Sequence, residues 1–279
     1  MVNSVHFSNH TGYPNGFRGG VLKGDDLLTI LEGLQNNGLL SDCDHVLTGY
    51  IGSESFLNAV LRVIDSARKG NTSKATRYVC DPVLGDDGEF YVPQELVKTF
   101  IEKLIPASDL VTPNQFEVEQ LTGVKIQSIS DAARACQILH AMGPEIIVIT
   151  SVVFDADIGK NENPTISMIA SQQNQSAEQE MWRIKCPLIP RRFTGTGDLC
   201  AALLLAHTDT LPLPQALEKT MNTMHAVIER THQYAISREK ECHDGQHKNN
   251  EVYSRELRLI QSKKDIEDPP KRFYADRIV

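Results

Sequence analysis

A short glycine-rich segment of this 279-residue chain carries residue types suited to phosphate chemistry. Gly195, Thr196, Gly197 and Asp198 are followed at once by an apolar run at 199–205, which predicts a buried helix that begins at the glycines. The amide N–H groups and dipole of a helix N-terminus bind anions. Asp198 puts a carboxylate beside this anion site, where it can take a proton from an alcohol during phosphoryl transfer.

The same segment also fits a purely structural interpretation. Thr196 or Asp198 would then cap a core helix, as threonine and aspartate commonly do. Short motifs of this kind recur without function. The choice between the two interpretations therefore depends on the rest of the chain.

Strand-like and helix-like segments alternate along the sequence, which predicts an α/β fold with a mostly parallel sheet and helices on both faces. The predicted strands are residues 2–7, 45–48, 77–80, 110–112 and 146–150, followed by an antiparallel pair at 166–170 and 181–184 with a solvated loop between them. The predicted helices are residues 25–34, 55–67, 93–104, 114–121, 131–142 (capped by Ser130), 216–234 and 251–260, with a charged surface linker at 238–250. Because no repeat or boundary is evident, residues 1–279 are predicted to form one domain.

Polar side chains follow four of the predicted parallel strands, at the edge of the sheet where ligands bind in such folds. These side chains are Tyr50, Asp81, Thr112 with Asn114, and Thr150 with Ser151. Asp-Pro and Pro-Asn sequences also form ordinary turns. Four polar strand ends together with the glycine-aspartate segment nevertheless favour a binding site.

Three carboxylates near these strand ends predict a site for a divalent cation. Asp81 and Asp86 lie five residues apart, and Glu117 follows Asn114 by three residues on one face of a short helix. Mg²⁺ prefers carboxylate oxygens, retained waters and substrate phosphates. In the structural alternative, Glu117 is an acid of the first helical turn and Asp86 belongs to an acidic turn at residues 85–88.

The composition limits the class of partner. A net charge of −8 argues against nucleic acid as the main partner. The six cysteines show no C-x-x-C spacing, which favours a reducing, cytoplasmic location. The sequence shows no signal peptide and no apolar run of membrane-spanning length, so we expect no membrane partner. A P-loop motif and the protein-kinase motif set are both absent.

Several motifs, in chain order, resemble those of pyridoxal kinases of the ribokinase-like superfamily. The matching stretches are residues 3–13, 47–50, 80–86, 112–117, 195–198 and 261–269. The glycine-aspartate segment is shared across the superfamily, whereas NHTGY at 9–13 combined with CDPVLGD at 80–86 is more specific to pyridoxal kinases. The resemblance implies a three-layer ribokinase-like fold with a mostly parallel central sheet.

The resemblance also implies an activity and a set of site residues. ATP would phosphorylate the 5′-hydroxymethyl group of pyridoxal, pyridoxine or pyridoxamine, with Asp198 as the base and the amides of Gly195, Thr196 and Gly197 holding the phosphoryl charge. The implied ATP contacts are Asn114, Glu117, Thr150, Ser151 and Thr196. The implied metal contacts are Asp81, Asp86, Thr112 and Glu117, for Mg²⁺ or another divalent cation and a monovalent cation, K⁺ or Na⁺. Phe7, His10, Thr11 and Tyr50 would face the pyridine ring, although His10 and Tyr50 also fit ordinary loop packing, and the protein would form a homodimer.

The chain departs from the family pattern in three places. Family members carry a first strand, a vitamin-contacting serine and a helix before the strand that opens this sequence, so we expect exposed backbone and an incomplete pocket wall here. Residues 152–180 fit the pattern poorly, and Pro190-Arg191-Arg192 is unusually basic. Two alternatives follow: a shortened, non-catalytic form that keeps nucleotide or dimer contacts, and a hydroxymethylpyrimidine kinase, against which the NHTGY segment argues.

Overall fold

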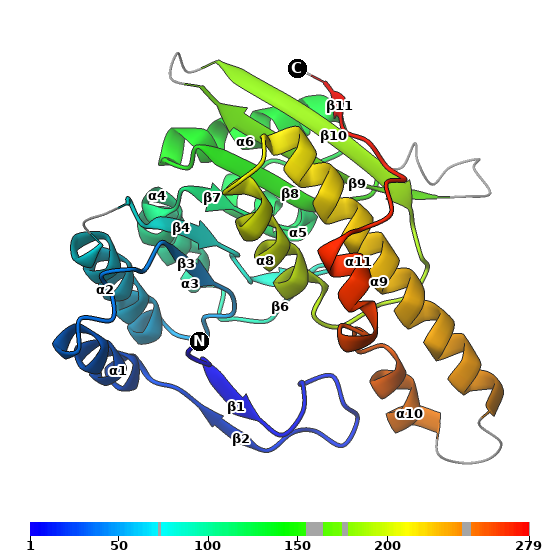
Figure 1. Cartoon of the computed structure of the whole chain (residues 1–279), viewed down its shortest axis with the longest axis horizontal. Coiled ribbons are helices and arrows are strands. Elements are labelled where there is room, and N and C mark those ends of the chain that lie inside the picture. The colour runs from blue at the N-terminus through cyan, green and yellow to red at the C-terminus, as the bar shows by residue number, and fades with distance from the viewer. Residues whose placement is uncertain (72–73, 155–163, 175–177, 242–246, 279) are drawn as a thin grey trace.

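A seven-stranded sheet forms the centre of the protein in a computed structural model, which describes residues 1–71, 74–154, 164–174, 178–241 and 247–278 (Figure 1). Its strand order is β11-β10-β9-β8-β7-β4-β3. The strands are β3 (His45–Thr48), β4 (Arg77–Cys80), β7 (Leu110–Val111), β8 (Ile146–Val152), β9 (Thr165–Gln173), β10 (Gln179–Pro187) and β11 (Asp276–Arg277).

The sheet has a parallel part and an antiparallel part. β3, β4, β7 and β8 are parallel neighbours, as the alternation of strands and helices predicts. β9 pairs antiparallel with both β8 and β10, which confirms the predicted antiparallel pair. Both strands are longer than expected, so residues 171–173 and 179–180 of the predicted loop are paired strand, while residues 175–177 of it lie outside the described part of the chain.

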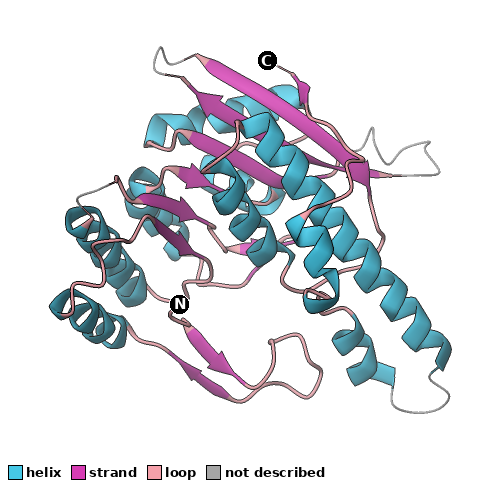
Figure 2. Cartoon of the chain, in the orientation of Figure 1, coloured by secondary structure: helices cyan, strands magenta, loops and turns pink. Residues whose placement is uncertain are grey.

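Two hydrophobic cores cover the two faces of the sheet, and the alternation of side chains along each strand explains the division. In β4, Tyr78 and Cys80 enter the core shared with α2 and α6, whereas Val79 enters the core shared with α8 and α9. Figure 2 shows helices on both sides of the strands, so the predicted three-layer fold is confirmed. The helices are α1 (Gly24–Asn36), α2 (Glu54–Gly70), α3 (Leu96–Thr99), a π-helical turn (Phe100–Leu104), α4 (Ile105–Ala107), α5 (Gln115–Thr122), α6 (Ile129–Met142), α8 (Thr196–Thr208), α9 (Leu213–Glu241), α10 (His247–Ser254), a 3-10 turn (Ile260–Ser262) and α11 (Lys263–Glu267).

Two short hairpins lie outside the main sheet. β1 (Val5–Phe7) pairs antiparallel with β2 (Gly19–Val21), and the loop between them reaches toward α10 (Figure 1). The strand predicted at 2–7 is confirmed only at residues 5–7, and its expected place in the parallel sheet is wrong, because it pairs antiparallel with a glycine-rich partner that shows no strand pattern. The second hairpin joins β5 (Gly85–Asp86) to β6 (Glu89–Phe90).

Three helix predictions require correction. The cap of α6 is Ser128 rather than Ser130, because the Ser128 hydroxyl accepts a hydrogen bond from Asp131 N at 3.2 Å. α9 continues to Glu241, so part of the predicted linker is helical, and residues 242–246 of that linker lie outside the described residues. The helix predicted at 251–260 is wrong in extent, because α10 ends at Ser254 and an irregular segment follows it.

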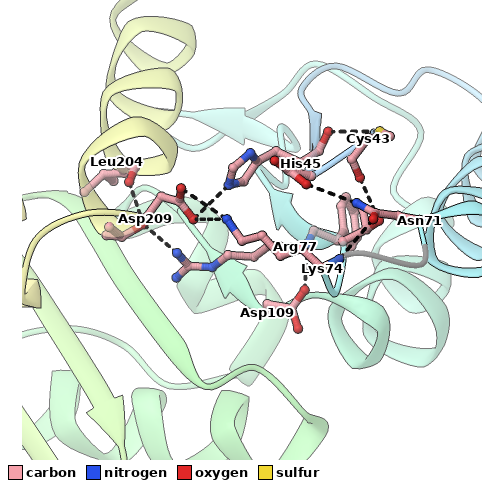
Figure 3. Close-up of polar contacts among 12 residues, drawn as sticks. Cys43, His45, Asn71, Lys74, Arg77, Asp109, Leu204 and Asp209 are labelled. Atoms are coloured by element: carbon pink, nitrogen blue, oxygen red, sulfur yellow. Dashed lines mark hydrogen bonds and ion pairs between the residues drawn. The ribbon is translucent and has the colours of Figure 1, made fainter. Parts of the chain in front are cut away.

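A polar cluster joins the end of α8 to the first residues of β3 and β4 (Figure 3). Asp209 directly follows α8, and its carboxylate lies 3.1 Å from His45 Nε2 and 3.2 Å from Lys74 Nζ. Arg77 donates a hydrogen bond to Thr208 Oγ1 at 3.1 Å. Hydrogen bonds from His45 and Lys74 lower the pKa of Asp209, so the charged carboxylate stabilises this junction.

We expect the Asp209→Asn variant to lose about 1 kcal/mol of unfolding free energy at pH 7, since the ion pair with Lys74 disappears and His45 loses a charged neighbour. Because the folded-state pKa of Asp209 is lowered, its contribution is present above the unfolded pKa and is lost as the pH falls through the folded value. Urea denaturation at pH 7 and pH 3 measures this. A variant equally destabilised at both values would contradict the electrostatic explanation.

Candidate active site

The glycine segment forms the start of a helix, as its sequence predicts. α8 begins at Thr196, and its N-cap is Gly195, which has the left-handed φ of +87°. Leu199 N donates to Gly195 O, so the amides before it are the unpaired first-turn donors. Gly195 has no side chain, and among the described residues neither Thr196 nor Asp198 caps the helix with a side-chain hydrogen bond. The capping alternative is therefore wrong, and these amides remain available to an anion.

The ends of β3 and β4 meet this helix start. Gly49 follows β3, and a Cβ placed on it would lie 3.6 Å from Asp198 Oδ1. Asp81 follows β4, and a Cβ placed on Gly197 would lie 3.7 Å from Asp81 Oδ2. The Asp198 side chain itself is exposed. The tertiary structure thus gathers an accessible carboxylate, free amides and a second carboxylate within one small region.

Two buried acids extend the site: Asp81 lies near Asp198, and Glu117 lies near Asp81. Asp81 is 6% exposed, and burial followed by the nearby Asp198 charge raises its pKa to about 7. Glu117 is 4% exposed, and burial followed by the Asp81 charge raises its pKa to about 8. The Thr112 hydroxyl is close enough to Asp81 to lower that pKa, yet it is buried without a hydrogen bond of good geometry. Two neighbouring acids with raised pKa values, beside an unpaired hydroxyl oxygen, fit a site where a bound cation would stabilise their charged forms.

Glu117 and Asn114 hold the loop beneath the β5–β6 hairpin. The two carboxylate oxygens of Glu117 accept hydrogen bonds from Leu84 N at 3.0 Å and Asn114 N at 2.8 Å. The Asn114 side chain accepts from Glu117 N and donates to Gly85 O, both at 2.8 Å. Glu117 is therefore an acid of the first helical turn, as the structural alternative predicts, and this is one part of its role.

We expect the Glu117→Ala variant to lose about 3 kcal/mol of unfolding free energy, because two buried backbone N–H groups lose their acceptor. Glu117→Gln should lose less, since its amide oxygen still accepts one hydrogen bond. Urea denaturation of both variants and the parent measures the difference. Equal stability of Glu117→Ala and the parent would show that water replaces these contacts.

Asp86 is the exposed last residue of β5 and directly precedes the turn of the β5–β6 hairpin. Its carboxylate accepts a hydrogen bond from Asp87 N at 2.9 Å. Arg192, from the basic segment before α8, forms an ion pair with Asp87. The acidic-turn interpretation of Asp86 thus agrees with its place in the structure, and the hairpin turn is joined to the loop that leads into Gly195.

Thr150 and Ser151 lie half-buried in β8, where the register with β9 is irregular. Thr150 N donates to Pro113 O at 2.9 Å, and its hydroxyl donates to the same oxygen at 3.4 Å. These contacts place the end of β8 beside the turn that carries Thr112 and Asn114. The strand ends that the sequence singles out are therefore neighbours.

The residues expected to face the pyridine ring are divided between two regions. Phe7 packs on Phe17 of the N-terminal hairpin, with ring centroids 4.3 Å apart. His10 and the exposed Thr11 lie in the loop of that hairpin, whereas Tyr50 follows β3 and is 37% exposed. Among the contacts of the described residues, none joins Phe7, Thr11 or Tyr50 directly to Asp198.

Sequence reasoning missed two residues that link parts of the site. Tyr13 donates a hydrogen bond to Glu256 at 2.8 Å, and Glu256 pairs through its backbone with Thr194, just before Gly195. Glu256 precedes the tail segment 261–269 that resembles the family. That resemblance is the one signal in the sequence that pointed to this part of the chain.

The fold and the site together define a small-molecule kinase with a ribokinase-like fold. A family model described as phosphomethylpyrimidine kinase matches residues 34–242. The chain is 44% identical to a pyridoxal kinase of Arabidopsis thaliana, covering 99% of this chain and 84% of that protein. It is 42% identical to a pyridoxal kinase of Homo sapiens, covering 96% and 85%.

A solved structure agrees with these sequence comparisons. Pyridoxal kinase from Leishmania donovani in complex with ADP and pyridoxamine superposes with a TM-score of 0.86 at 30% identity, covering 100% of this chain and 88% of that chain. The chain belongs to the pyridoxal kinase family. Within the described residues, no helix is long and apolar enough to cross a membrane.

Proposed function

We propose that this protein transfers the γ-phosphoryl group of ATP to the 5′-hydroxymethyl group of pyridoxal, pyridoxine or pyridoxamine. The observation that carries the proposal is the accessible Asp198 carboxylate in the first turn of α8, beside amides that no side chain caps. Solved relatives from Leishmania donovani hold ADP with pyridoxamine or with pyridoxine, which supports this pair of substrates.

In the proposed reaction, the substrate hydroxyl oxygen forms a bond to the γ-phosphorus while the bond from that phosphorus to the ADP oxygen breaks. Asp198 takes the hydroxyl proton. The amides of Gly195, Thr196 and Gly197 point at the phosphoryl oxygens and stabilise their charge. Because phosphoryl transfer depends mainly on positioning and electrostatics, this small set of groups is sufficient on the protein side.

The nucleotide is proposed to lie across the ends of β7 and β8. Thr150, Ser151 and Thr196 offer hydroxyl groups, while Asn114 and Glu117 shape the loop at Leu84 and Gly85 through their backbone contacts. The ion pair between Arg192 and Asp87 joins the β5–β6 hairpin to the segment that leads into Gly195. A cation at the site would offset the repulsion between polyphosphate and the buried acids.

The cation site is proposed to use Asp81 and Thr112 directly and Glu117 through water, with Asp86 at its outer edge. Within the part of the chain that the structure describes, no three His, Cys, Asp or Glu side chains are grouped as a complete metal site. Mg²⁺ keeps several waters and shares its coordination with substrate phosphates, so it needs few protein ligands. A monovalent cation, K⁺ or Na⁺, is proposed beside Asp81 and Thr112.

The pyridine ring is proposed to bind between the N-terminal hairpin and the end of β3, in contact with Phe7, His10, Thr11 and Tyr50. The hydroxymethyl group then lies toward Asp198. We further propose a single-domain, cytoplasmic homodimer with no nucleic-acid or membrane partner, in keeping with the net charge of −8.

One assay tests the proposal against its alternatives. Purified protein with Mg-ATP is given pyridoxal, pyridoxine, pyridoxamine or hydroxymethylpyrimidine, and the phosphorylated products are measured. We expect the three vitamers to be phosphorylated and hydroxymethylpyrimidine to be a poor substrate. Preferential phosphorylation of the pyrimidine would favour a hydroxymethylpyrimidine kinase. The description of the matching family model, phosphomethylpyrimidine kinase, is the reason to include this substrate. ATP binding without any turnover would favour a non-catalytic form.

A further inference from the structure

The segment that follows α10 returns to the anion site. Thr194 and Glu256 form a parallel bridge, in which Thr194 N donates to Arg255 O at 3.3 Å. The side chain of the next residue, Leu257, would lie 4.0 Å from a Cβ placed on Gly195. The backbone of Glu256 is therefore fixed against the residues that lead directly into α8.

The carboxylate of Glu256 reaches the loop of the N-terminal hairpin. Tyr13 Oη donates a hydrogen bond to Glu256 Oε1 at 2.8 Å, and His10 Nε2 lies 3.7 Å from the same oxygen. The rings of His10 and Tyr13 pack together with centroids 4.8 Å apart. One carboxylate oxygen thus contacts two aromatic side chains that lie more than 240 residues earlier in the chain.

The hydrogen bonds determine which groups face Glu256. Gly12 N donates to His10 Nδ1 at 3.1 Å, so that nitrogen is an acceptor and the neutral imidazole carries its proton on Nε2. Nε2 is buried without a hydrogen-bond partner and is directed at Glu256. Burial, followed by Glu256, raises the pKa of Tyr13 to about 12, so Tyr13 remains a protonated donor at neutral pH.

We propose that Glu256 is a positioning residue that sets the distance between the N-terminal hairpin, one wall of the proposed vitamin pocket, and the segment that leads into α8. Its backbone contacts the segment before Gly195, and its carboxylate contacts the loop that carries His10 and Thr11. The inference rests on the proposed function, because it assigns a role in binding the vitamer at that site. Glu256 touches no reacting atom; it acts through Tyr13 and His10.

The test compares kinetics of four variants with those of the parent. We expect Glu256→Ala and Tyr13→Phe each to raise KM for pyridoxal about tenfold, since each removes a hydrogen bond to a charged acceptor. KM for ATP should stay within about twofold, and kcat should fall less than KM rises. The double variant should be no worse than Glu256→Ala alone, because Glu256→Ala already removes the contact that Tyr13→Phe removes. Glu256→Gln keeps an acceptor oxygen for Tyr13 and should restore most of the affinity.

Glu251→Ala is the matched control, because Glu251 pairs with Arg255 in the same segment without a contact to the N-terminal loop. It should leave KM for pyridoxal unchanged. A ¹⁵N NMR spectrum should show the Nε2–H tautomer of His10 in the parent, which tests the geometry without activity. Unchanged KM in Glu256→Ala, an equal rise in KM for ATP, or additive effects in the double variant would overturn the inference.

Failure of the proposed function can be told apart from failure of this inference. A parent protein without turnover overturns the proposed function alone. Calorimetric Kd values for pyridoxal then decide the role of Glu256, with the same tenfold ratio expected between Glu256→Ala and the parent. Equal Kd values, or no binding to the parent, would overturn the inference.

Discussion

Replacing Asp198 with asparagine is expected to lower kcat for pyridoxal phosphorylation by about 10³-fold, because the amide cannot take the hydroxyl proton. The exposed Asp198 side chain makes no described contact that stabilises the fold, so the variant should fold normally. ATP affinity should be retained or slightly increased, since a negative charge beside the phosphates is removed. Formation of pyridoxal 5′-phosphate and calorimetric binding of ATP measure the two effects.

Asp209→Asn is the matched control, because it makes the same substitution at the opposite end of α8. We expect it to lose stability and to keep kcat. Normal turnover by Asp198→Asn would show that Asp198 is not the base. Loss of both turnover and ATP binding would show instead that the substitution disrupts the anion site as a whole.

Replacing Gly195 with alanine is expected to lower kcat by about 10²-fold, the typical effect of losing one donor to a developing charge. Gly195 has a φ of +87°, a conformation that costs a residue with a Cβ about 1–2 kcal/mol. Relief of that strain would turn the first amides of α8 away from the phosphoryl oxygens. Steady-state kinetics and urea denaturation of the same preparation give the two quantities.

Gly123→Ala is the control that separates a loss of folding stability from a loss of amide donors at the start of α8. Gly123 ends α5 with a φ of +72°, so alanine there carries a similar backbone cost. We expect both variants to lose a similar free energy of unfolding, and Gly195→Ala alone to lose turnover. If both lost turnover equally, reduced stability rather than donor geometry would explain the effect.

Much of the parallel part of the sheet could be predicted from the sequence, because strands such as His45–Thr48 and Arg77–Cys80 are short β-rich runs with clear turn residues after them. The N-terminal hairpin could not be predicted, since β2 contains Gly19 and Gly20 and has no alternating pattern. The predicted bounds of the helix at 251–260 were wrong for a related reason. Its segment is held by long-range contacts, such as Thr194 with Glu256, rather than by a local apolar period.

The sequence by itself determined the chemistry available at the start of α8. A left-handed glycine, free amides and an aspartate within four residues are local properties, fixed by backbone geometry and residue type. Only the tertiary structure decided what surrounds them. Burial raises the pKa of Asp81 and Glu117, and Glu256 joins the first loop of the chain to the segment before Gly195. Those features depend on contacts between distant segments, which no local pattern of residues specifies.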